Sequence, residues 1–252
     1  MTIAFVHGNP ETDVVWSGLV GELADRGVDG IVMLSPPGFG APVPAGWGGT
    51  REEYREWLVG EVAALADAAG RPVDLVAHDW GAGHVFGVLE VRPDLVRSWA
   101  CDCVGLMHPD YVWHDNAQVW QTPGAGEEAV AFMAGLPSED RAALLVSIGM
   151  DEASAISSAE ATEEMAGCIL PLYRSAAQPA CAELGARLAA ADLPPGLALH
   201  ATEDPYVGFA VEAATALGAR LATMEGAGHW WMCERTAEAA DHLVSFWASL
   251  TA

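Results

Sequence analysis

The sequence Val73-Asp-Leu-Val-Ala-His-Asp-Trp-Gly81 passes from an apolar run into a tight turn. Its first five residues predict a buried β-strand, and the residues that follow Gly81 have helical character. Asp79 has a small residue two positions away on either side, Ala77 and Gly81. A sharp strand-to-helix turn needs such neighbours because it is strained and crowded. The segment therefore predicts a strand and a helix joined by a turn that presents Asp79.

Short apolar runs alternate with longer helical stretches on both sides of this segment. Residues 51–69, for example, have their apolar side chains at helical spacing. This alternation is typical of an α/β fold, in which crossover helices join parallel strands and cover both faces of the sheet. The predicted strands are residues 3–6, 31–34, 73–77, 99–104, 197–201 and 221–224.

One long interval, residues 108–194, contains no strand candidate and is filled by helical stretches rich in Ala, Glu and Met. A helical insertion between two strands of a parallel sheet is typical of a lid over the carboxyl ends of the strands, where open α/β sheets bind ligands. We therefore expect a core formed by residues 1–107 and 195–252, with residues 108–194 as an inserted helical lid.

The composition narrows the range of partners. The formal net charge is −24 and all 11 basic residues are arginine, which argues against a nucleic-acid partner because a polyanion would be repelled. No apolar run approaches the ~20 residues that cross a bilayer, and the first residues do not resemble a secretion signal. The five cysteines show neither a disulfide framework nor zinc-ligand spacing. We expect a cytoplasmic protein with reduced thiols, no metal and no cofactor.

Three further segments stand in the order that catalysis through Asp79 would need. His7-Gly8-Asn9-Pro10 follows the first predicted strand, where the backbone N–H of Asn9 could complete an oxyanion hole with that of Trp80. Asp204 follows the fifth predicted strand, and His229 follows the last one. Nucleophile, acid and histidine in this order predict a catalytic triad.

Two alternatives stay open at this point. Asp79 could do no more than cap the helix that follows it, although the ordered partners favour a nucleophile. Asp102, at the end of the fourth predicted strand, is a rival to Asp204 as the acid of the triad. His78, beside Asp79, is expected to be a packed structural residue rather than a base.

The chain resembles the α/β-hydrolase superfamily, and within it the epoxide hydrolase and haloalkane dehalogenase group. Residues 78–81 and 7–10 carry that group's His-Asp-Trp-Gly and His-Gly-Asn-Pro motifs, and residues 37–40 are similar to another of its segments. Typical members have two strands before the His-Gly motif, at which this sequence begins. The resemblance thus implies a sheet of about six strands that lacks the usual N-terminal strands 1 and 2. An open edge at residues 31–34 would allow a homodimer.

An aspartate nucleophile determines the type of reaction. Attack on an ester would give a labile anhydride, so the natural target of a carboxylate is an sp³ carbon that bears a leaving group. We expect an alkyl ester on Asp79, which water activated by His229 then hydrolyses. The backbone N–H groups of Asn9 and Trp80 would hold the oxyanion, and Asp204 would orient His229. The expected partners are a small apolar organic substrate and water.

The leaving group separates two hydrolytic hypotheses, because an alkoxide needs a proton donor. Tyr173 lies in a Tyr-Arg element that resembles the lid tyrosine of epoxide hydrolases, and the Trp-Gln-Thr-Pro-Gly segment at 120–124 resembles their lid. The position of the second lid tyrosine has Asn116, with His114 and Tyr111 nearby; the resemblance favours His114. The leading hypothesis is therefore an epoxide hydrolase that forms a vicinal diol.

A halide, in contrast, needs only N–H dipoles. The side chains of Asn9 and Trp80 are the pair with which haloalkane dehalogenases hold the departing ion, so a haloalkane dehalogenase is the alternative. A third hypothesis, of another class, is a non-hydrolytic member of the fold that binds a ligand without turnover. The complete set of Asp79, Asp204 and His229 argues against this third hypothesis.

Overall fold

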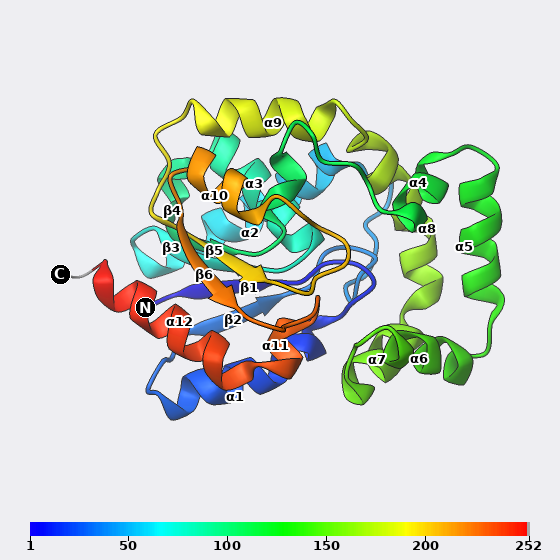
Figure 1. The fold of residues 1–252 in the computed structure, drawn as a ribbon, viewed down its shortest axis with the longest axis horizontal. Helices are drawn as coiled ribbons and strands as arrows, with labels where there is room; N and C mark the ends of the chain where they lie inside the picture. Colours follow the sequence, from blue (N-terminus) through cyan, green and yellow to red (C-terminus); the bar gives the residue numbers. More distant parts are fainter. Residues whose placement is uncertain (251–252) are drawn as a thin grey trace.

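The computed structural model describes residues 1–250, apart from the side chains of residues 162 and 163. Parallel strands form one sheet at its centre, in the order β2-β1-β3-β4-β5-β6 (Figure 1). This sheet confirms the predicted α/β fold with about six mostly parallel strands. The strands are β1 (Ile3–Val6), β2 (Ile31–Leu34), β3 (Val73–Ala77), β4 (Val96–Cys101), β5 (Gly196–Ala201) and β6 (Arg220–Met224).

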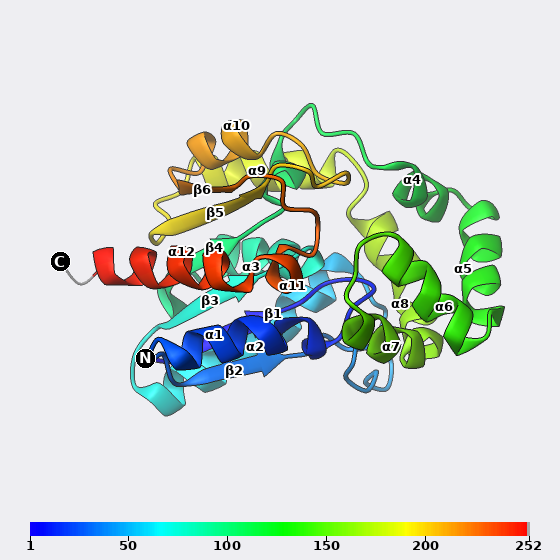
Figure 2. The same ribbon diagram turned by 60° about the horizontal axis from the view of Figure 1, so that its bottom comes forward.

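Helices cover both faces of the sheet, so alternate residues of a strand enter two different cores. Ile3 and Phe5 of β1 pack in one core, whereas Ala4 and Val6 pack in the other. A strand that is buried on both faces needs a continuous apolar run, which is why these segments show no polar alternation. Helices α1 (Ser17–Asp25) and α12 (Thr236–Ser249) lie on one side of the sheet (Figures 1 and 2). Helices α2 (Arg51–Ala69) and α3 (Trp80–Val91) lie on the other side.

Helix α2 has the bounds that the sequence predicts because both of its ends are capped. Thr50 and Glu53 form a capping box, in which the Thr50 side chain accepts from the Glu53 N–H and the Glu53 carboxylate accepts from the Thr50 N–H. Gly70 ends the helix in the left-handed conformation, with φ 65°. These contacts satisfy backbone groups that a helix end leaves without partners.

The predicted fourth strand, 99–104, is misplaced by three residues. Strand β4 begins at Val96 and ends at Cys101. Cys103 has a φ of 50°, a left-handed backbone conformation that cannot continue a strand, and Val104–Met107 form a 3-10 helix, η3. The apolar residues after Asp102 were mistaken for strand because a short apolar run does not distinguish the two structures.

The segment between β4 and β5 is helical, as the sequence predicts. Its helices are α4 (Asp115–Gln121), α5 (Ala125–Gly135), α6 (Ser138–Ser147), α7 (Glu152–Glu160), α8 (Thr162–Ser175) and α9 (Ala180–Ala189). Helices α4 to α8 lie beyond the carboxyl ends of the strands, at the right of Figures 1 and 2. Helix α9 lies back over the core, where it packs on α3 and η3. Helices α4 to α8, called the lid helices below, thus lie beyond the sheet, and α9 returns the chain to it.

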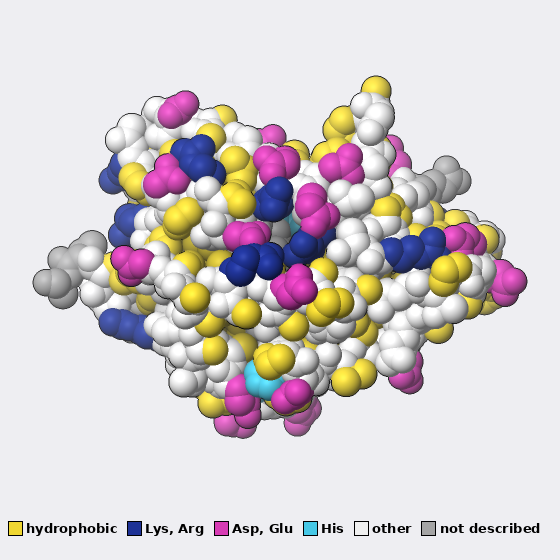
Figure 3. Space-filling model, turned by 90° about the horizontal axis from the view of Figure 1, so that it is seen from above, with side chains coloured by type: hydrophobic (Ala, Val, Ile, Leu, Met, Phe, Trp, Pro, Cys, Tyr) yellow, Lys and Arg dark blue, Asp and Glu magenta, His cyan; other side chains and the backbone are white. Residues whose placement is uncertain are grey.

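The remaining short elements are η1 (Asp13–Trp16), η2 (Pro93–Leu95), α10 (Ala210–Ala216) and α11 (Trp231–Glu234). None of the helices in the described part of the chain is long and apolar enough to cross a membrane. On the face shown in Figure 3, basic and acidic side chains are interspersed. Glu90 of α3 forms ion pairs with both Arg55 and Arg187.

Candidate active site

Asp79 lies at the sharp turn between β3 and α3, with φ 51° and ψ −123°. A residue other than glycine in such a backbone conformation costs on the order of 1–3 kcal/mol, and this strain is typical of functional sites. Gly81 is required here, because a Cβ at this position would lie 2.1 Å from the carbonyl oxygen of Val6. The Asp79 side chain makes no capping hydrogen bond to α3. The turn therefore presents the Asp79 side chain to the adjoining cavity and does not use it as a helix cap, as the sequence predicts.

The loop after β1 holds one oxygen of the Asp79 carboxylate. The backbone N–H of Asn9 donates to Asp79 Oδ1 at 2.8 Å. Trp80 is the first residue of α3, where backbone N–H groups have no partner within the helix. A Cβ added at Gly8 would lie 2.5 Å from the Trp80 nitrogen, so this loop and the start of α3 are in close contact. The two predicted oxyanion donors thus lie on either side of Asp79.

His229 lies between the other two carboxylates of the predicted triad. Its Nδ1 is 2.9 Å from Asp204 Oδ2, and its Nε2 is 3.9 Å from Asp79 Oδ2. A proton on Nδ1 would be held by Asp204, which leaves Nε2 free to act as a base beside Asp79. Asp102, the rival acid, contacts His78 and the Trp231 indole instead. The structure therefore brings Asp204 to His229 and directs Asp102 elsewhere.

Burial and the neighbouring charges set the pKa values of this group. Burial raises the pKa of Asp79 to about 6, although His229 and the Asn9 N–H act in the opposite direction. Burial alone would lower the pKa of His229, but the Asp204 carboxylate outweighs it and raises that pKa. For Asp204, burial opposes ionisation and the His229 ring favours it, with a lowered pKa as the result. Asp204 is therefore ionised at neutral pH.

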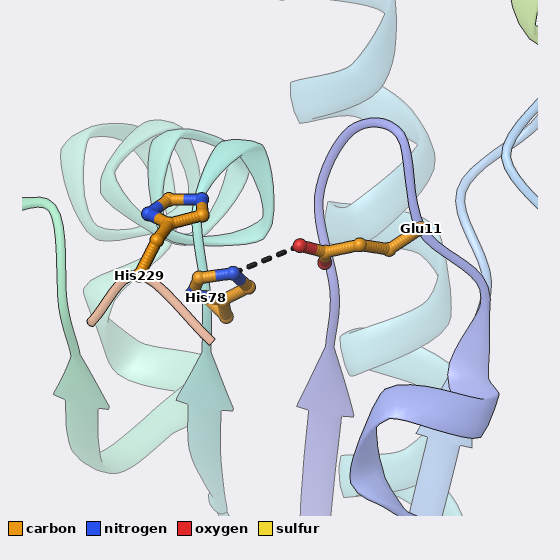
Figure 4. A group of neighbouring side chains, drawn as sticks. All are labelled: Glu11, His78 and His229. Carbon is orange, nitrogen blue, oxygen red and sulfur yellow. Dashed lines mark ion pairs between the residues drawn. The ribbon is translucent and has the colours of Figure 1, made fainter. Parts of the chain in front are cut away.

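A second buried cluster, formed by Glu11, His78 and Asp102, lies beside His229. Figure 4 shows two of its members, Glu11 and His78, next to His229. The His78 ring pairs with Glu11 Oε1 at 2.9 Å through Nε2 and with Asp102 Oδ2 through Nδ1. Burial would lower the pKa of His78, but Asp102 and Glu11 raise it well above its ordinary value. The His78 and His229 rings are 4.5 Å apart between centroids. His78 is thus a buried cation beside His229, more than the packed residue that the sequence suggests.

The two carboxylates of this cluster also hold the backbone of the site. Glu11 Oε2 accepts from the Gly8 N–H at 3.0 Å, and Asp102 Oδ1 accepts from the Asp79 N–H at 3.0 Å. The indole N–H of Trp230 donates to Glu11 at 2.8 Å, and that of Trp231 donates to Asp102 at 2.6 Å. A buried ion pair is stable only with such additional hydrogen bonds. The cluster thereby fixes the loop at Gly8, the turn at Asp79 and the loop after His229 relative to one another.

Two groups in this region have the donor atoms of a metal site. Glu11, His78 and His229 have ligand atoms within 4.8 Å of one another, and so do Cys103, Asp204 and His229. In the first group, the ion pairs of His78 already use both ring nitrogens. A metal in the second group would take the Nδ1 of His229 away from Asp204. Either metal would therefore compete with the contacts that organise the triad.

Tyr173 of α8 faces Asp79 from the lid side. Its hydroxyl oxygen accepts from Asn9 Nδ2 at 3.3 Å, and its ring packs edge-on against Trp80 with centroids 5.0 Å apart. Burial, together with the nearby Asp79 carboxylate, raises the pKa of Tyr173 well above its ordinary value, although hydrogen bonding to Asn9 and Trp80 lowers it. The phenol is therefore protonated at neutral pH and can donate a proton.

The candidates for a second lid donor differ in their surroundings. His114 and Asn116 both line the cavity above Asp79. His114 Nδ1 accepts from the Ala117 N–H at 3.3 Å as the N-cap of α4, which places the ring proton on Nε2. Burial lowers the pKa of His114, so the ring is neutral. The Tyr111 hydroxyl donates instead to the Tyr206 carbonyl at 3.1 Å.

The cavity between lid and core has a volume of about 430 Å³ and two distinct ends. Its polar end holds Asp79, His229 and Tyr173, joined by Tyr206, whose ring lies 4.8 Å from that of His229. Apolar lid residues form the rest of the wall, among them Trp120, Met133, Leu144, Leu145 and Ile148. No sequence motif marks Tyr206 as a residue of this site, except that it follows Asp204 closely. Such a cavity fits an uncharged apolar molecule with one reactive polar group.

The raised pKa of Asp79 predicts that this residue destabilises the fold. Because its folded pKa of about 6 exceeds the ordinary 3.8, stability falls as the pH rises through this range. Asp79→Asn should increase the free energy of unfolding at pH 8 by roughly 2–3 kcal/mol. The gain should vanish below about pH 4. Urea denaturation at pH 8 and at pH 4 measures the free energy of unfolding of the wild type and the variant. Asp110→Asn, at an exposed position, is the control. An equal effect at both pH values would contradict the argument.

Comparisons with known proteins place the chain in context. A family model described as "Alpha/beta hydrolase family" matches residues 3–242. No curated protein matches the chain. Three of the similar solved structures are haloalkane dehalogenase DbeA from Bradyrhizobium elkani (21% identity, TM-score 0.65, 98% of this chain and 91% of that chain), Cfl2 from Burkholderia cenocepacia (20%, 0.76, 97% and 87%), and 2-hydroxy-6-oxo-6-phenylhexa-2,4-dienoate hydrolase from Rhodococcus sp. strain RHA1 (18%, 0.75, 98% and 90%). At these identities the likeness shows a shared fold.

Proposed function

Since the chain belongs to the alpha/beta hydrolase family, we propose that it is an epoxide hydrolase that converts an apolar epoxide to a vicinal diol. The reaction proceeds through an alkyl ester on Asp79. The triad of Asp79, Asp204 and His229, the lid donor Tyr173 and the apolar cavity support this proposal. The proposed reaction is more specific than membership of the family, because one fold can carry many different reactions.

In the first step, Asp79 opens the epoxide. Oδ1 is held by the Asn9 N–H, so Oδ2 is the oxygen available for attack on the epoxide carbon. The new C–O bond forms as the C–O bond of the epoxide breaks, and the departing alkoxide takes the proton of the Tyr173 hydroxyl. The neutral His114 can donate a hydrogen bond from Nε2 to the same oxygen. Since the pKa of Asp79 is about 6, this step is lost as the pH falls through that value.

In the second step, water hydrolyses the ester. His229 Nε2 takes a proton from the water, whose oxygen attacks the Cγ atom of Asp79. Negative charge develops on Oδ1, where the N–H groups of Asn9 and Trp80 stabilise it by roughly 3 kcal/mol per well-placed donor. The diol leaves with the proton from His229, and the Asp79 carboxyl returns a proton to Tyr173 through water. Asp204 stabilises the transient imidazolium.

The contact that favours an epoxide over a haloalkane is the one at the Tyr173 oxygen. Asn9 Nδ2, one of the two side-chain N–H donors that would hold a halide, donates to this oxygen at 3.3 Å. Because the phenol oxygen accepts this bond, the hydroxyl proton remains available for an alkoxide. A leaving group that needs a proton therefore suits the site better than a halide does.

Dehalogenation is the second candidate because the site contains both Asn9 and Trp80. A shift of Tyr173 away from these two side chains would leave their N–H groups facing the cavity. A similar solved structure is a haloalkane dehalogenase, which is consistent with this candidate but, at 21% identity, reflects the fold. We rank this reaction second because the Asn9 side chain donates to the Tyr173 oxygen.

A direct comparison of substrates tests the proposal. The wild-type protein is given 1,2-epoxyoctane and 1-bromooctane, which have the same chain length, and diol and bromide release are measured. We expect kcat/KM for the epoxide to exceed that for the bromide by at least tenfold. Faster bromide release would favour the dehalogenase. Binding of both compounds without product from either would support a non-hydrolytic role.

A further inference from the structure

A second, smaller chamber opens beside the main cavity. It has a volume of about 90 Å³ and lies inside the lid, between α5, α6, α7 and α8. Both spaces share wall residues, including Asn9, Met133 and Leu145, so the chamber continues the cavity above Asp79. Most of its other lining is apolar, for example Met165 and Ile169. The chamber is thus placed to receive one arm of a molecule that reacts at Asp79.

One wall of the chamber carries a buried guanidinium. Arg141 of α6 is 9% exposed and is the one arginine that lines either space in the described part of the chain. Its hydrogen bonds go to backbone carbonyls, from Nε and Nη2 to Ala159 at 3.1 and 2.7 Å and from Nη1 to Ala134 and Leu136 at 3.2 and 2.5 Å. Within the described residues, no carboxylate forms an ion pair with it.

Two helix ends balance the charge of Arg141. Ala134 and Leu136 lie at the carboxyl end of α5, and Ala159 lies at that of α7. Each such end carries about −0.5 of an elementary charge. Together they offset the guanidinium, so an anionic ligand is not needed for neutrality. The Asp79 carboxylate, which lines the adjoining cavity, and the net charge of −24 further disfavour an anion.

A hydrogen-bond donor nevertheless remains. A guanidinium has five N–H groups, and the four bonds to carbonyls use four of them. The fifth, on Nη2, has no acceptor among the described residues. A buried donor without an acceptor is costly, so a ligand that brings a single acceptor would gain from binding here.

We propose that this chamber binds an apolar arm of the substrate that carries one neutral oxygen acceptor, such as a ketone, ester carbonyl or hydroxyl. The acceptor bonds to the remaining N–H of Arg141. The chamber, at about 90 Å³, is much smaller than the main cavity, at about 430 Å³, so this arm is the shorter part of the substrate. This inference rests on the proposed function in so far as the arm belongs to the molecule that reacts at Asp79.

Binding of unreactive probes tests the proposal without turnover. Dissociation constants for octane, octan-2-one and octanoate are measured by calorimetry on the wild type and on the Arg141→Met variant. We expect Arg141→Met to weaken octan-2-one binding about tenfold more than octane binding, since it removes a hydrogen bond from a charged donor. Equal changes for the two probes, or octanoate as the tightest of the three in the wild type, would overturn the proposal.

A second variant keeps the test valid if Arg141→Met disturbs the lid. Ala166→Leu on α8 fills the chamber and leaves Arg141 in place. It should weaken octan-2-one at least fivefold. Gly167→Ala, the control on the same helix, should change nothing because an added Cβ has no neighbour within 4 Å. Unchanged octan-2-one binding in Ala166→Leu would overturn the proposal. If the probes behave as expected but no epoxide is hydrolysed, the chamber stands and the proposed reaction fails.

Discussion

The His229→Gln variant should form diol roughly 10²–10⁴-fold more slowly than the wild type in the steady state, the usual contribution of a general base. Alkylation of Asp79 needs Asn9 and Tyr173 but not His229, so the first step should continue. The variant should therefore consume about one equivalent of epoxide rapidly and then nearly stop. Rapid-quench measurement of epoxide consumption against enzyme concentration gives this stoichiometry.

The same substitution at a distant histidine provides the control. His242 lies on α12, 4.0 Å from Glu238, and has no contact with the triad. His242→Gln should leave turnover unchanged. Loss of the initial burst in His229→Gln, with the fold intact by circular dichroism, would show that His229 acts before the ester forms. The assignment of a base to the second step would then be wrong.

The Tyr173→Phe variant should open epoxides about 100-fold more slowly, because the alkoxide would leave without its proton donor. Any release of bromide from a bromoalkane should change less than threefold, since a halide takes no proton. Single-turnover alkylation rates for the two substrates measure this difference. The matched control is Tyr111→Phe, which removes a hydroxyl that bonds to the Tyr206 carbonyl. A larger loss for the bromide than for the epoxide would identify Tyr173 as part of a halide site.

The turn at Asp79 could be predicted because its requirements are local. Strain confines its neighbours to small residues, and Gly81 must approach the Val6 carbonyl. The roles of Asp204 and His229 could also be predicted from their order along the chain, since parallel strands place their carboxyl ends at one edge of the sheet. The sequence could not decide between Asp204 and Asp102 as the acid, because both residues follow the end of a strand. Contacts with His78 and Trp231, which no spacing reveals, direct Asp102 away from His229.

The buried cluster beside His229 could not be predicted for the same reason. Glu11, His78 and Asp102 are far apart in the sequence, and each has a common structural role when considered alone. Their joint effect, a buried cation beside His229, arises only when β1, β3 and β4 lie side by side. The chamber at Arg141 likewise depends on how α5 and α7 end against α6, which sequence periodicity does not determine.

The most direct test of the account is a mass measurement on the Asp79 peptide. His229→Gln is incubated with 1,2-epoxyoctane, quenched and digested. The peptide containing Asp79 should gain the mass of one epoxide molecule, and fragmentation should place the added mass on Asp79. An unmodified Asp79 peptide in a variant that binds the epoxide, or an adduct on another residue, would contradict the claim that Asp79 is the nucleophile.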